Sequence, residues 1–442
     1  MQEEVKPEEV PVKQAKHKGD APTLRERLGA KPCVWTERML AALKSGVQVK
    51  KWFSLRDKLC RLPVLIEAWE QVKSREGSGG IDKVSIDQFE QHAKKHLLKL
   101  QRELEEGTYM PAPVRRVYIP KPGSHEKRPL GIPTIRDRVV QTALLYVIGP
   151  IFEVGFHRHS YGFRPCMGCK DALREVDQLL NAGYHWVVDA DLKSYFDTID
   201  HEQLLDCVKE RIADGLIIDL INKYLQQGVM DSMGRWEATQ RGSPQGAVIS
   251  PLLANLYLNE MDHMLSAKGY HCIRYADDFV ILSRSQEEAT QALLEVKSWS
   301  EHKLLILHPK KTKLVHLNDG FEFLGYRFIA GRKYVRDKSL KKLRESIKAK
   351  TKRTNGQSLE DIINDINPTL YGWFVYFKHA YKTTFPYIDG WVRMRLRSIL
   401  RKRHRKKGRG RGSDHQEWPN QYFADLGLFS LEQAHKAACQ SR

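Results

Sequence analysis

Two adjacent acids inside an apolar, strand-like run constrain this chain more than any other feature. The run reads Arg274-Tyr275-Ala276-Asp277-Asp278-Phe279-Val280-Ile281-Leu282. Burying one carboxylate without a partner costs several kcal/mol, and two neighbouring carboxylates also repel each other. A divalent cation removes both costs, and Mg²⁺ is the ion that favours carboxylates together with substrate phosphates. A hairpin tip with two solvated acids is the alternative interpretation of the same residues.

A second acidic segment precedes this one in the chain. In Val187–Leu192, Asp189 and Asp191 alternate with apolar residues, so both acids point to the same face of a strand. An acid that faces further acids on a hairpin is the arrangement for two-metal phosphoryl transfer, in which ions about 4 Å apart activate the attacking hydroxyl and stabilise the leaving oxygen. Asp189 fits either a supporting or a purely structural role, and Asp197 fits a helix cap or a solvated turn.

The overall charge of the chain indicates its class of partner. The 442 residues, long enough for two or three domains, include 73 Lys and Arg against 54 Asp and Glu, a formal net charge of +19. Nucleic acid is favoured over a membrane surface as the polyanion, because no apolar run reaches the length of a spanning helix. We therefore expect no membrane partner. The seven scattered cysteines argue against a disulfide framework, and Cys166 and Cys169 lack a second ligand pair for zinc.

Apolar spacing and breaker residues predict the order of elements. Residues 1–30 are charged and show little apolar periodicity, which predicts a flexible tail. Helices are expected between Trp35 and about Leu104, and strands are expected on both sides of a hairpin turn at Lys121–Ser124. Further helices are predicted over 137–154, 169–181, 202–211, 217–227, 249–265 and 287–302.

The charge balance changes after Gly331. Residues 393–411 contain many Lys and Arg but no Asp or Glu. Such a concentrated basic run suits the phosphates and 2′-hydroxyls of structured RNA. Our candidates for RNA contact in this run are Arg393, Arg395 and Arg397. The aromatic residues within 368–377 recur at helical spacing, which favours a core role over base stacking.

Several short motifs occur in a fixed order between about residue 113 and residue 330. Besides the two acidic segments, they are Val117–Pro122, Arg128–Thr134, Ser160–Pro165, Gly242–Gly246, Ile249–Asn255, Pro309–Lys313 and Phe323–Tyr326. With these motifs the chain resembles bacterial group II intron-encoded reverse transcriptases, or maturases, of the compact type that lacks an HNH endonuclease domain. Ala247 departs from the Pro-Gln-Gly-Gly sequence that is usual in this family. Because Ala resists positive φ, we expect the local loop to differ.

The resemblance implies an α+β fold of right-hand polymerase architecture, with fingers, a palm and a C-terminal helical thumb/maturase domain. The expected division of the chain is a flexible N-terminal tail (1–30), an N-terminal extension with the fingers (31–185), a palm with the catalytic acids (186–330), a thumb/maturase domain (331–402) and a basic C-terminal tail (403–442).

The expected catalytic residues are the acids of the two strands. Asp191 and Asp277 are the expected metal ligands, with Asp278 as a third carboxylate that a tight turn must bring to the same side. They are expected to hold two Mg²⁺ ions, for which Mn²⁺ can substitute. The resemblance assigns Lys121 and Arg128, on either side of a hairpin turn, to the triphosphate of the incoming dNTP.

Further nucleotide and primer contacts also follow from the resemblance. Phe196 matches the family's steric gate, a ring that would clash with a 2′-hydroxyl. Gln245, in a Gly-rich loop, is a candidate for hydrogen bonds to the nucleotide or template backbone. Lys311 is a candidate for neutralising phosphate charge or protonating the leaving pyrophosphate. Gly325 and Tyr326 resemble the primer-gripping turn.

The chain is therefore expected to be an RNA-directed DNA polymerase that also binds group II intron RNA and assists splicing and retromobility by target-primed reverse transcription. Its expected partners are intron RNA, an RNA template with a DNA primer or target DNA, and dNTPs, in the bacterial cytoplasm near the nucleoid. Two alternatives stay open. One is a domesticated reverse transcriptase, for example a defence-associated one, and the other is an RNA-binding splicing cofactor with an inactive polymerase, against which the intact acids argue.

Overall fold

A four-stranded antiparallel sheet forms the palm of the molecule and contains both acidic segments. The structure is a computed structural model that describes residues 21–45, 51–120, 127–231, 233–406 and 412–440. The strands of the palm sheet, in spatial order, are β6 (His271–Tyr275), β7 (Asp278–Ser283), β3 (Trp186–Asp191) and β8 (Lys313–His316). The two acidic strands β3 and β7 are therefore the central pair of the sheet, where apolar residues are covered on both faces.

Side-chain alternation divides the palm sheet into two faces that belong to different cores. Val188 and Ala190 pack into a core that is shared with the fingers, whereas Val187 packs into a core that is shared with the thumb. Asp191 lies on the same face as Val187, at the end of its strand. The helices that cover the first face are α12 (Ser250–Ala267) and α13 (Gln286–His302), and the helix that covers the second is α8 (Cys169–Asn181).

The fingers combine helices with a small sheet. The strands of this sheet, in spatial order, are β2 (Lys127–Ile132), β1 (Val114–Pro120), β4 (Val229–Met230) and β5 (Trp236–Glu237). β1 and β2 form the expected antiparallel hairpin, whose predicted turn at Lys121–Ser124 lies outside the described residues. The helices before the palm sheet, apart from α8, are α1 (Leu24–Arg27), α2 (Glu37–Lys44), α3 (Arg56–Leu59), α4 (Leu62–Ser74), α5 (Ile86–Gln91), α6 (Ala93–Glu106) and α7 (Ile135–Glu153). The helices between β3 and β4 are α9 (Tyr195–Thr198), α10 (His201–Lys209) and α11 (Gly215–Gln226).

The helices predicted from apolar spacing are confirmed, with ends that agree to within about two residues. Local caps explain the observed starts. For example, the Ser285 side chain accepts a hydrogen bond from the backbone N–H of Glu288 at the start of α13. The expected flexible tail does not extend to residue 30, because α1 forms before that point and Leu28 and Ala30 are buried. Residues 1–20 lie outside the described part of the chain.

The thumb follows a three-stranded sheet at the edge of the palm. The strands are β9 (Phe321–Phe323), β10 (Tyr326–Ile329) and β11 (Arg332–Val335), and the thumb helices are α14 (Asp337–Lys350), α15 (Leu359–Phe377) and α16 (Thr384–Arg403). Phe374 and Phe377 of α15 are buried in the thumb core, as helical spacing predicted, while Tyr371 is 58% exposed.

The segment expected to be a basic C-terminal tail is folded. Its helices are α17 (Asp414–Glu417), α18 (Asn420–Asp425) and α19 (Leu431–Gln440). Trp418, Phe423 and Leu431 are buried in the thumb core. The basic run at residues 403–411 led us to expect a tail and not helices, because the apolar residues that fix the fold come only after this run.

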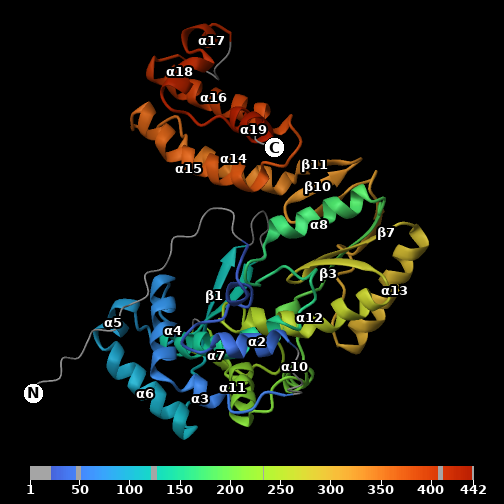
Figure 1. The fold of residues 1–442 in the computed structure, drawn as a ribbon. Helices are drawn as coiled ribbons and strands as arrows, with labels where there is room; N and C mark the ends of the chain where they lie inside the picture. The colour runs from blue at the N-terminus through green and yellow to red at the C-terminus, as the bar shows by residue number, and fades with distance from the viewer. Residues whose placement is uncertain (1–20, 46–50, 121–126, 232, 407–411, 441–442) are drawn as a thin grey trace, which may run out of the picture.

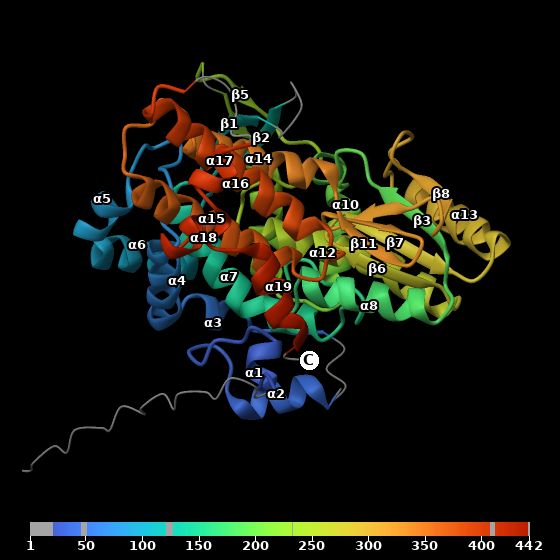
Figure 2. The same cartoon turned by 90° about the horizontal axis from the view of Figure 1, so that it is seen from above.

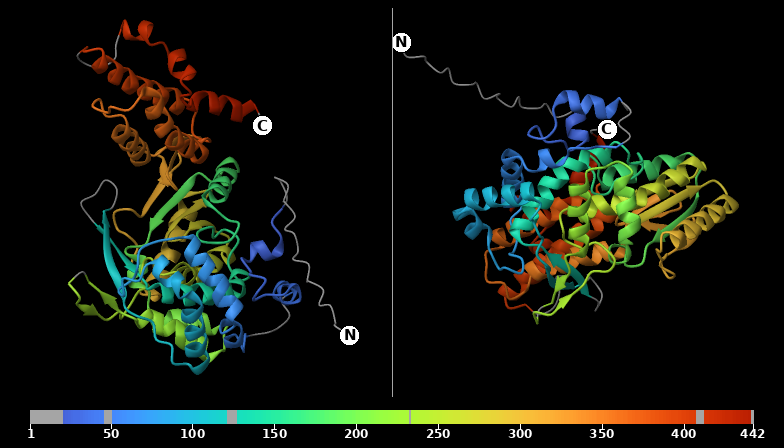
Figure 3. Two further views of the ribbon diagram at one scale, coloured as in Figure 1. Left: turned by 90° about the vertical axis from the view of Figure 1, so that its left-hand side faces the viewer. Right: turned by 90° about the horizontal axis from the view of Figure 1, so that it is seen from below.

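Figure 1 shows the thumb helices stacked on the palm, with β10 and β11 at the junction. Seen from above, β1 and β2 lie on one side of the molecule and α8 and α19 on the other (Figure 2). The side view in Figure 3 shows the same separation between the β1–β2 strands and the C-terminal helix. Within the described residues, no helix combines the length and apolar character that crossing a bilayer requires.

Candidate active site

The acids of the two central palm strands lie next to each other. In the antiparallel register of β3 and β7, Asp191 is opposite Asp278, and Asp277 lies in the two-residue turn between β6 and β7. Ala276, the other turn residue, has a φ of 61°, a conformation that residues with a Cβ adopt uncommonly. A tight turn of this kind was predicted from the sequence, because side-chain alternation in a flat strand would separate Asp277 from Asp278.

Burial and mutual repulsion raise the pKa values of these carboxyl groups. Burial, followed by the charges of Asp189 and Asp277, raises the pKa of Asp278 to about 7. Burial is also the main cause that raises the pKa of Asp189 to about 6. The pKa of Asp277 is raised by burial and then by Asp191. The cluster therefore has more negative charge than its protein surroundings compensate, which is the electrostatic condition that favours a divalent cation.

Two cations expected at the site act on this cluster. Lys311 extends from the loop before β8, and its Nζ lies 2.6 Å from a carboxylate oxygen of Asp191. Arg128 is exposed on β2, and the positive charges of Arg128 and Lys311 both lower the pKa of Asp277 against the effect of burial. Lys121, the other expected triphosphate contact, lies outside the described residues. The Lys311 side chain is 60% exposed, so its ammonium group has room to turn from Asp191 toward a phosphate.

The acids of the turn do not by themselves form a closed metal site. Among the described residues, no group of three or more His, Cys, Asp or Glu side chains is placed so that it could hold a metal ion. Mg²⁺ keeps several waters and is usually bound by one or two carboxylates together with substrate phosphates. Asp191, Asp277 and Asp278 offer oxygen donors of this kind on adjoining backbone segments.

A buried arginine supports the acidic turn from behind. The Arg274 side chain is fully buried, and its Nη2 lies 2.5 Å from a carboxylate oxygen of Asp262. Its Nη1 donates to the carbonyl oxygen of Ala276 and to Oδ1 of Asn255, both at 2.9 Å. Its Nη2 also donates to Oγ of Ser160 at 2.7 Å. The guanidinium group therefore joins the backbone of the acidic turn to α12 and to the segment before α8.

A close backbone approach adds to this support. The side-chain amide of Asn255 donates to the carbonyl oxygen of Gly162 at 2.7 Å. A Cβ at Gly162 would lie only 2.4 Å from the backbone nitrogen of Ala276, so this position requires glycine. Sequence reasoning missed this network. The available signal was one cation in an apolar strand, Arg274, and an acid, Asp262, that lies at helical spacing from apolar residues of its helix, each of which needs a buried partner.

Backbone hydrogen bonds hold the Gly242–Gly246 loop between the palm and the fingers. The N–H of Ser243 donates to the carbonyl oxygen of Phe196 at 2.7 Å, and the N–H of Gly131 donates to the carbonyl oxygen of Gln245 at 2.7 Å. The structure thus brings two predicted nucleotide contacts, Phe196 and Gln245, into one cluster of loops beside β2. The Phe196 ring is half-buried against the palm core, which leaves part of it accessible.

The backbone at Ala247 does not adopt the conformation that Ala resists. The residue with positive φ is Gly246, at 108°, and Ala247 is not in the left-handed region. A second missed residue, the buried Gln141 of α7, accepts a hydrogen bond from the backbone N–H of Val248 at 2.7 Å. Gln141 therefore fixes the end of the loop that leads into α12.

The expected primer-binding turn joins β9 to β10. Leu324 and Gly325 have positive φ values of 46° and 84°. Tyr326 is only 1% exposed, and its hydroxyl donates to the carbonyl oxygen of Tyr376 at 2.7 Å. The ring of Tyr326 thus anchors the turn to the thumb, and the backbone around Gly325 is the part of the turn left for primer contact.

The three α16 arginines expected to contact RNA have unlike surroundings. Arg397 is 2% exposed and donates to the carbonyl oxygen of Trp418 at 2.9 Å. Arg395 donates to Oγ1 of Thr351 at 2.6 Å and to its carbonyl oxygen at 2.7 Å, and Arg393 is half-buried. The position of Arg397 does not support RNA contact, because this side of α16 faces the C-terminal helices. A basic run in the sequence spreads around all sides of a helix.

Comparisons with known proteins agree with this geometry. Residues 119–328 match the family described as reverse transcriptase (RNA-dependent DNA polymerase), and residues 340–418 match the group II intron maturase-specific domain. Protein YkfC of Escherichia coli (strain K12) is 39% identical over 293 residues, which cover 57% of this chain and 76% of YkfC. The group II intron-encoded protein LtrA of Lactococcus lactis subsp. cremoris is 30% identical over 335 residues, which cover 61% of this chain and 55% of LtrA.

A solved structure titled "Partial Cas6-RT-Cas1--Cas2 complex" matches 56% of this chain and 41% of its own, with 24% identity and a TM-score of 0.36. That score is too low to add to the fold assignment. The two family matches, by contrast, span the palm with its paired acids and most of the thumb. The chain therefore belongs to the family of group II intron-encoded reverse transcriptases, which combine a polymerase with a maturase domain.

Proposed function

We propose that this protein copies RNA into DNA at the acidic turn of the palm. The observation that carries the proposal is the pairing of Asp191 with Asp278, with Asp277 in the adjoining turn. In the proposed reaction the 3′-hydroxyl of a DNA primer attacks the α-phosphate of a dNTP, and pyrophosphate leaves.

Two Mg²⁺ ions are the proposed cofactors, and Mn²⁺ is the proposed substitute. Asp191 and Asp277 would hold them, with Asp278 as the third carboxylate. When bound, such ions lower the pKa of the attacking hydroxyl and stabilise the negative charge on the leaving oxygen. The raised pKa of Asp277 and the pKa of about 7 for Asp278 support this assignment, because burial and neighbouring acids oppose the ionisation of both carboxyl groups and a cation would favour it.

The remaining site residues orient the substrates in this proposal. The half-buried ring of Phe196 forms a floor under the sugar and excludes a 2′-hydroxyl. Gln245 contacts the nucleotide or the template backbone from a loop that is hydrogen-bonded to β2. Arg128 and Lys121 bind the triphosphate from the fingers hairpin. Lys311, now paired with Asp191, neutralises phosphate charge or donates a proton to the departing pyrophosphate.

We further propose that the thumb binds group II intron RNA, so that the protein assists splicing and then reverse-transcribes the intron from a nick in target DNA. The match of residues 340–418 to a maturase-specific domain supports this step. The exposed cations of α14, such as Lys348, also support it. The proposed location is the bacterial cytoplasm near the nucleoid, where intron RNA and target DNA are both present.

Primer extension tests the first proposal. An annealed RNA template and DNA primer are incubated with the protein and dNTPs in the presence of Mg²⁺, Mn²⁺ or EDTA. We expect extension with Mg²⁺, slower or less selective extension with Mn²⁺ and none with EDTA. Extension in EDTA would exclude the metal assignment. A protein that extends primers but neither binds nor splices a group II intron transcript would instead be a domesticated polymerase.

A further inference from the structure

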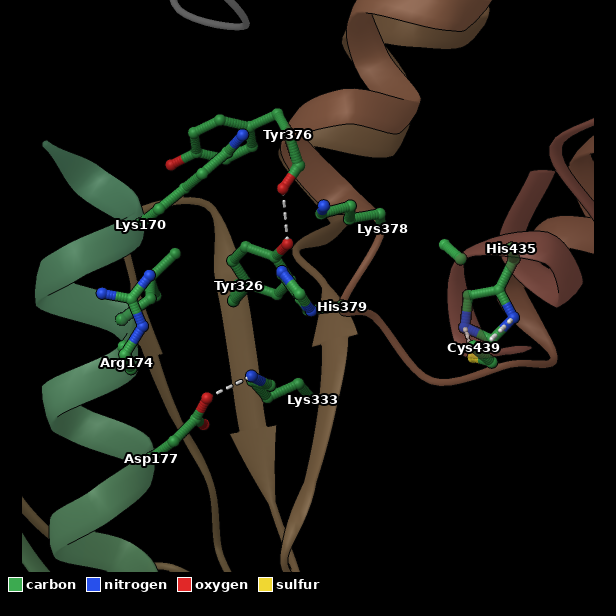
Figure 4. A pocket seen from close by; sticks show the side chains of 12 residues that line it. Lys170, Arg174, Asp177, Tyr326, Lys333, Tyr376, Lys378, His379, His435 and Cys439 are labelled. Carbon is green, nitrogen blue, oxygen red and sulfur yellow. Dashed lines mark hydrogen bonds and ion pairs between the residues drawn. The ribbon is translucent and has the colours of Figure 1, made fainter. Parts of the chain in front are cut away.

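A cavity of about 570 Å³ lies where the palm, the thumb and the last helix meet. Its walls come from α8, from β10 and β11, from the end of α15 and from α19 (Figure 4). Tyr326 and Tyr376 line it, and both hydroxyls are already bonded to backbone carbonyl oxygens, at 2.7 Å each. This part of the lining is therefore fixed by the junction between palm and thumb.

Positive charge predominates around this cavity. Lys170 and Arg174 extend from α8, Lys333 from β11, and Lys378 follows α15. Of the described residues that line the cavity, only Asp177 is acidic.

The carboxylates available among the described residues leave two of these four cations without an ion pair. Asp177 already pairs with Lys333, and Arg174 pairs with Asp171 at 3.0 Å in an exposed and therefore weak ion pair. Within the described part of the chain, neither Lys170 nor Lys378 has a carboxylate partner. The concave arrangement of these cations gives the site an affinity for anions that scattered surface lysines do not have.

The lining favours the backbone of a nucleic acid over a small organic ligand. Pockets for small molecules are mostly apolar with a few polar groups, whereas here cations are distributed around the rim. Lys and Arg side chains spaced in this way are the usual contacts for successive phosphates.

The cavity adjoins the expected primer-binding turn through Tyr326, but its cations come from α8, from β11 and from the residue after α15, where no nucleotide or primer contact is proposed. Arg128, a proposed triphosphate contact, lies on β2. In Figure 2, α8 and α19 lie on the opposite side of the molecule from β1 and β2. A nucleic acid held by these cations would therefore contact the protein on a different side from the triphosphate of the incoming nucleotide.

We propose that this cavity, the α8–α19 pocket, binds the phosphodiester backbone of a folded RNA while the palm holds its template and primer. The inference rests on the proposed binding of group II intron RNA and adds a second contact surface to it. Simultaneous occupation of both sites would let one protein molecule stay attached to a structured RNA during DNA synthesis.

The test compares two triple variants that lose the same number of cations. The pocket variant carries Lys170→Gln, Arg174→Gln and Lys378→Gln. The control variant carries Lys209→Gln, Lys268→Gln and Lys297→Gln, which replace exposed lysines on the α10, α12 and α13 side of the palm. The probes are a transcribed group II intron RNA and, separately, an annealed RNA template with a DNA primer. Filter binding across a salt series gives the affinity and its salt dependence for each probe.

We expect the pocket variant to bind intron RNA about tenfold more weakly, with a log–log salt slope smaller by about 2 to 3, since each lost phosphate contact removes about 0.7 to 0.9. Template–primer binding and extension should stay at the wild-type level, and the control variant should match the wild type with both probes. A charge-preserving variant, with Lys170→Arg, Arg174→Lys and Lys378→Arg, should restore binding. Thermal melts of all variants identify any loss of folding.

Three results would overturn the proposal. The first is wild-type affinity for intron RNA in the folded pocket variant. The second is an equal loss of binding to both probes, which would assign the pocket to the template–primer path. The third is an equal loss in the control variant, which would mean that net charge alone controls binding. Failure of the wild type to extend primers would refute the proposed polymerase activity but would leave the RNA-binding comparison intact.

Discussion

The palm and the thumb are both rich in charge, but the two regions use it differently. In the palm, Asp277 and Asp278 have raised pKa values because burial and neighbouring acids oppose their ionisation. In α16 of the thumb, the buried Arg397 is bonded to a backbone carbonyl oxygen. The acid pair of the palm turn keeps its charge available for a ligand, whereas this part of the thumb uses its charge to hold its own fold. The density of charge in a sequence does not distinguish the two cases.

The largest effect is expected from the palm acids. Asp277→Asn or Asp191→Asn should lower primer extension by about 10³-fold or more, because a charge that acts in the transition state is lost. The thermal unfolding midpoint should stay constant or rise, because repulsion within the cluster is relieved. Single-turnover extension and calorimetry measure the two quantities. Asp319→Asn, at an exposed acid after β8, is the control. Extension at the wild-type rate by Asp277→Asn would show that the palm does not use this charge in catalysis.

The buried ion pair between Arg274 and Asp262 tests the case in which charge in the palm stabilises the fold and does not bind a ligand. Arg274→Leu should lower the free energy of unfolding by about 3–5 kcal/mol, because Asp262 would become an unpaired buried carboxylate. The double variant Arg274→Leu/Asp262→Leu should recover part of this loss, since no buried charge is then left alone. Denaturant titrations measure both values. If the single and double variants were equally stable, the ion pair would have no part in holding the turn.

The third prediction separates buried from exposed cations in the thumb. Arg397→Gln should cost about 1–3 kcal/mol of stability, because buried carbonyl groups lose a donor. It should leave the salt dependence of RNA binding unchanged. Lys348→Gln combined with Lys352→Gln, both exposed, should reduce the log–log slope by about 1.4 to 1.8 with little effect on stability. A reduced slope in a stable Arg397→Gln protein would contradict the structural role of this arginine.

The smallest effect concerns the half-buried ring beside the acids. Phe196→Val should reduce discrimination against ribonucleotides by about tenfold or more, because the floor under the 2′ position is opened. The ratio of kcat/KM for dNTP and rNTP measures this effect. Phe53→Val, at a ring that is 66% exposed, is the control. Unchanged discrimination in a folded Phe196→Val protein would make this ring part of the core.

Local patterns were sufficient to predict the strands and helices that carry the site. Alternation in β3 and the apolar run of β7 predicted that Asp191 would face the acid pair, and apolar spacing located the palm helices. The partners of buried charges could not be predicted, since they depend on contacts between distant segments. Arg274 meets Ser160 across 114 residues, and Arg397 is buried by helices that follow a run of uniform charge. Both outcomes are decided by tertiary packing, which overrides local composition.

The support of the acidic turn by Arg274 also determines when during synthesis the protein becomes a polymerase. Asp191 leaves the ribosome early, but the turn needs Ser160, Asn255 and Arg274 together, and contacts over such separations form late in folding. A nascent chain that ends before β6 therefore contains Asp191 but cannot assemble the active site. We therefore expect catalytic competence only after β6 and β7 have docked against β3 and α12, which supply Asp191 and Asn255.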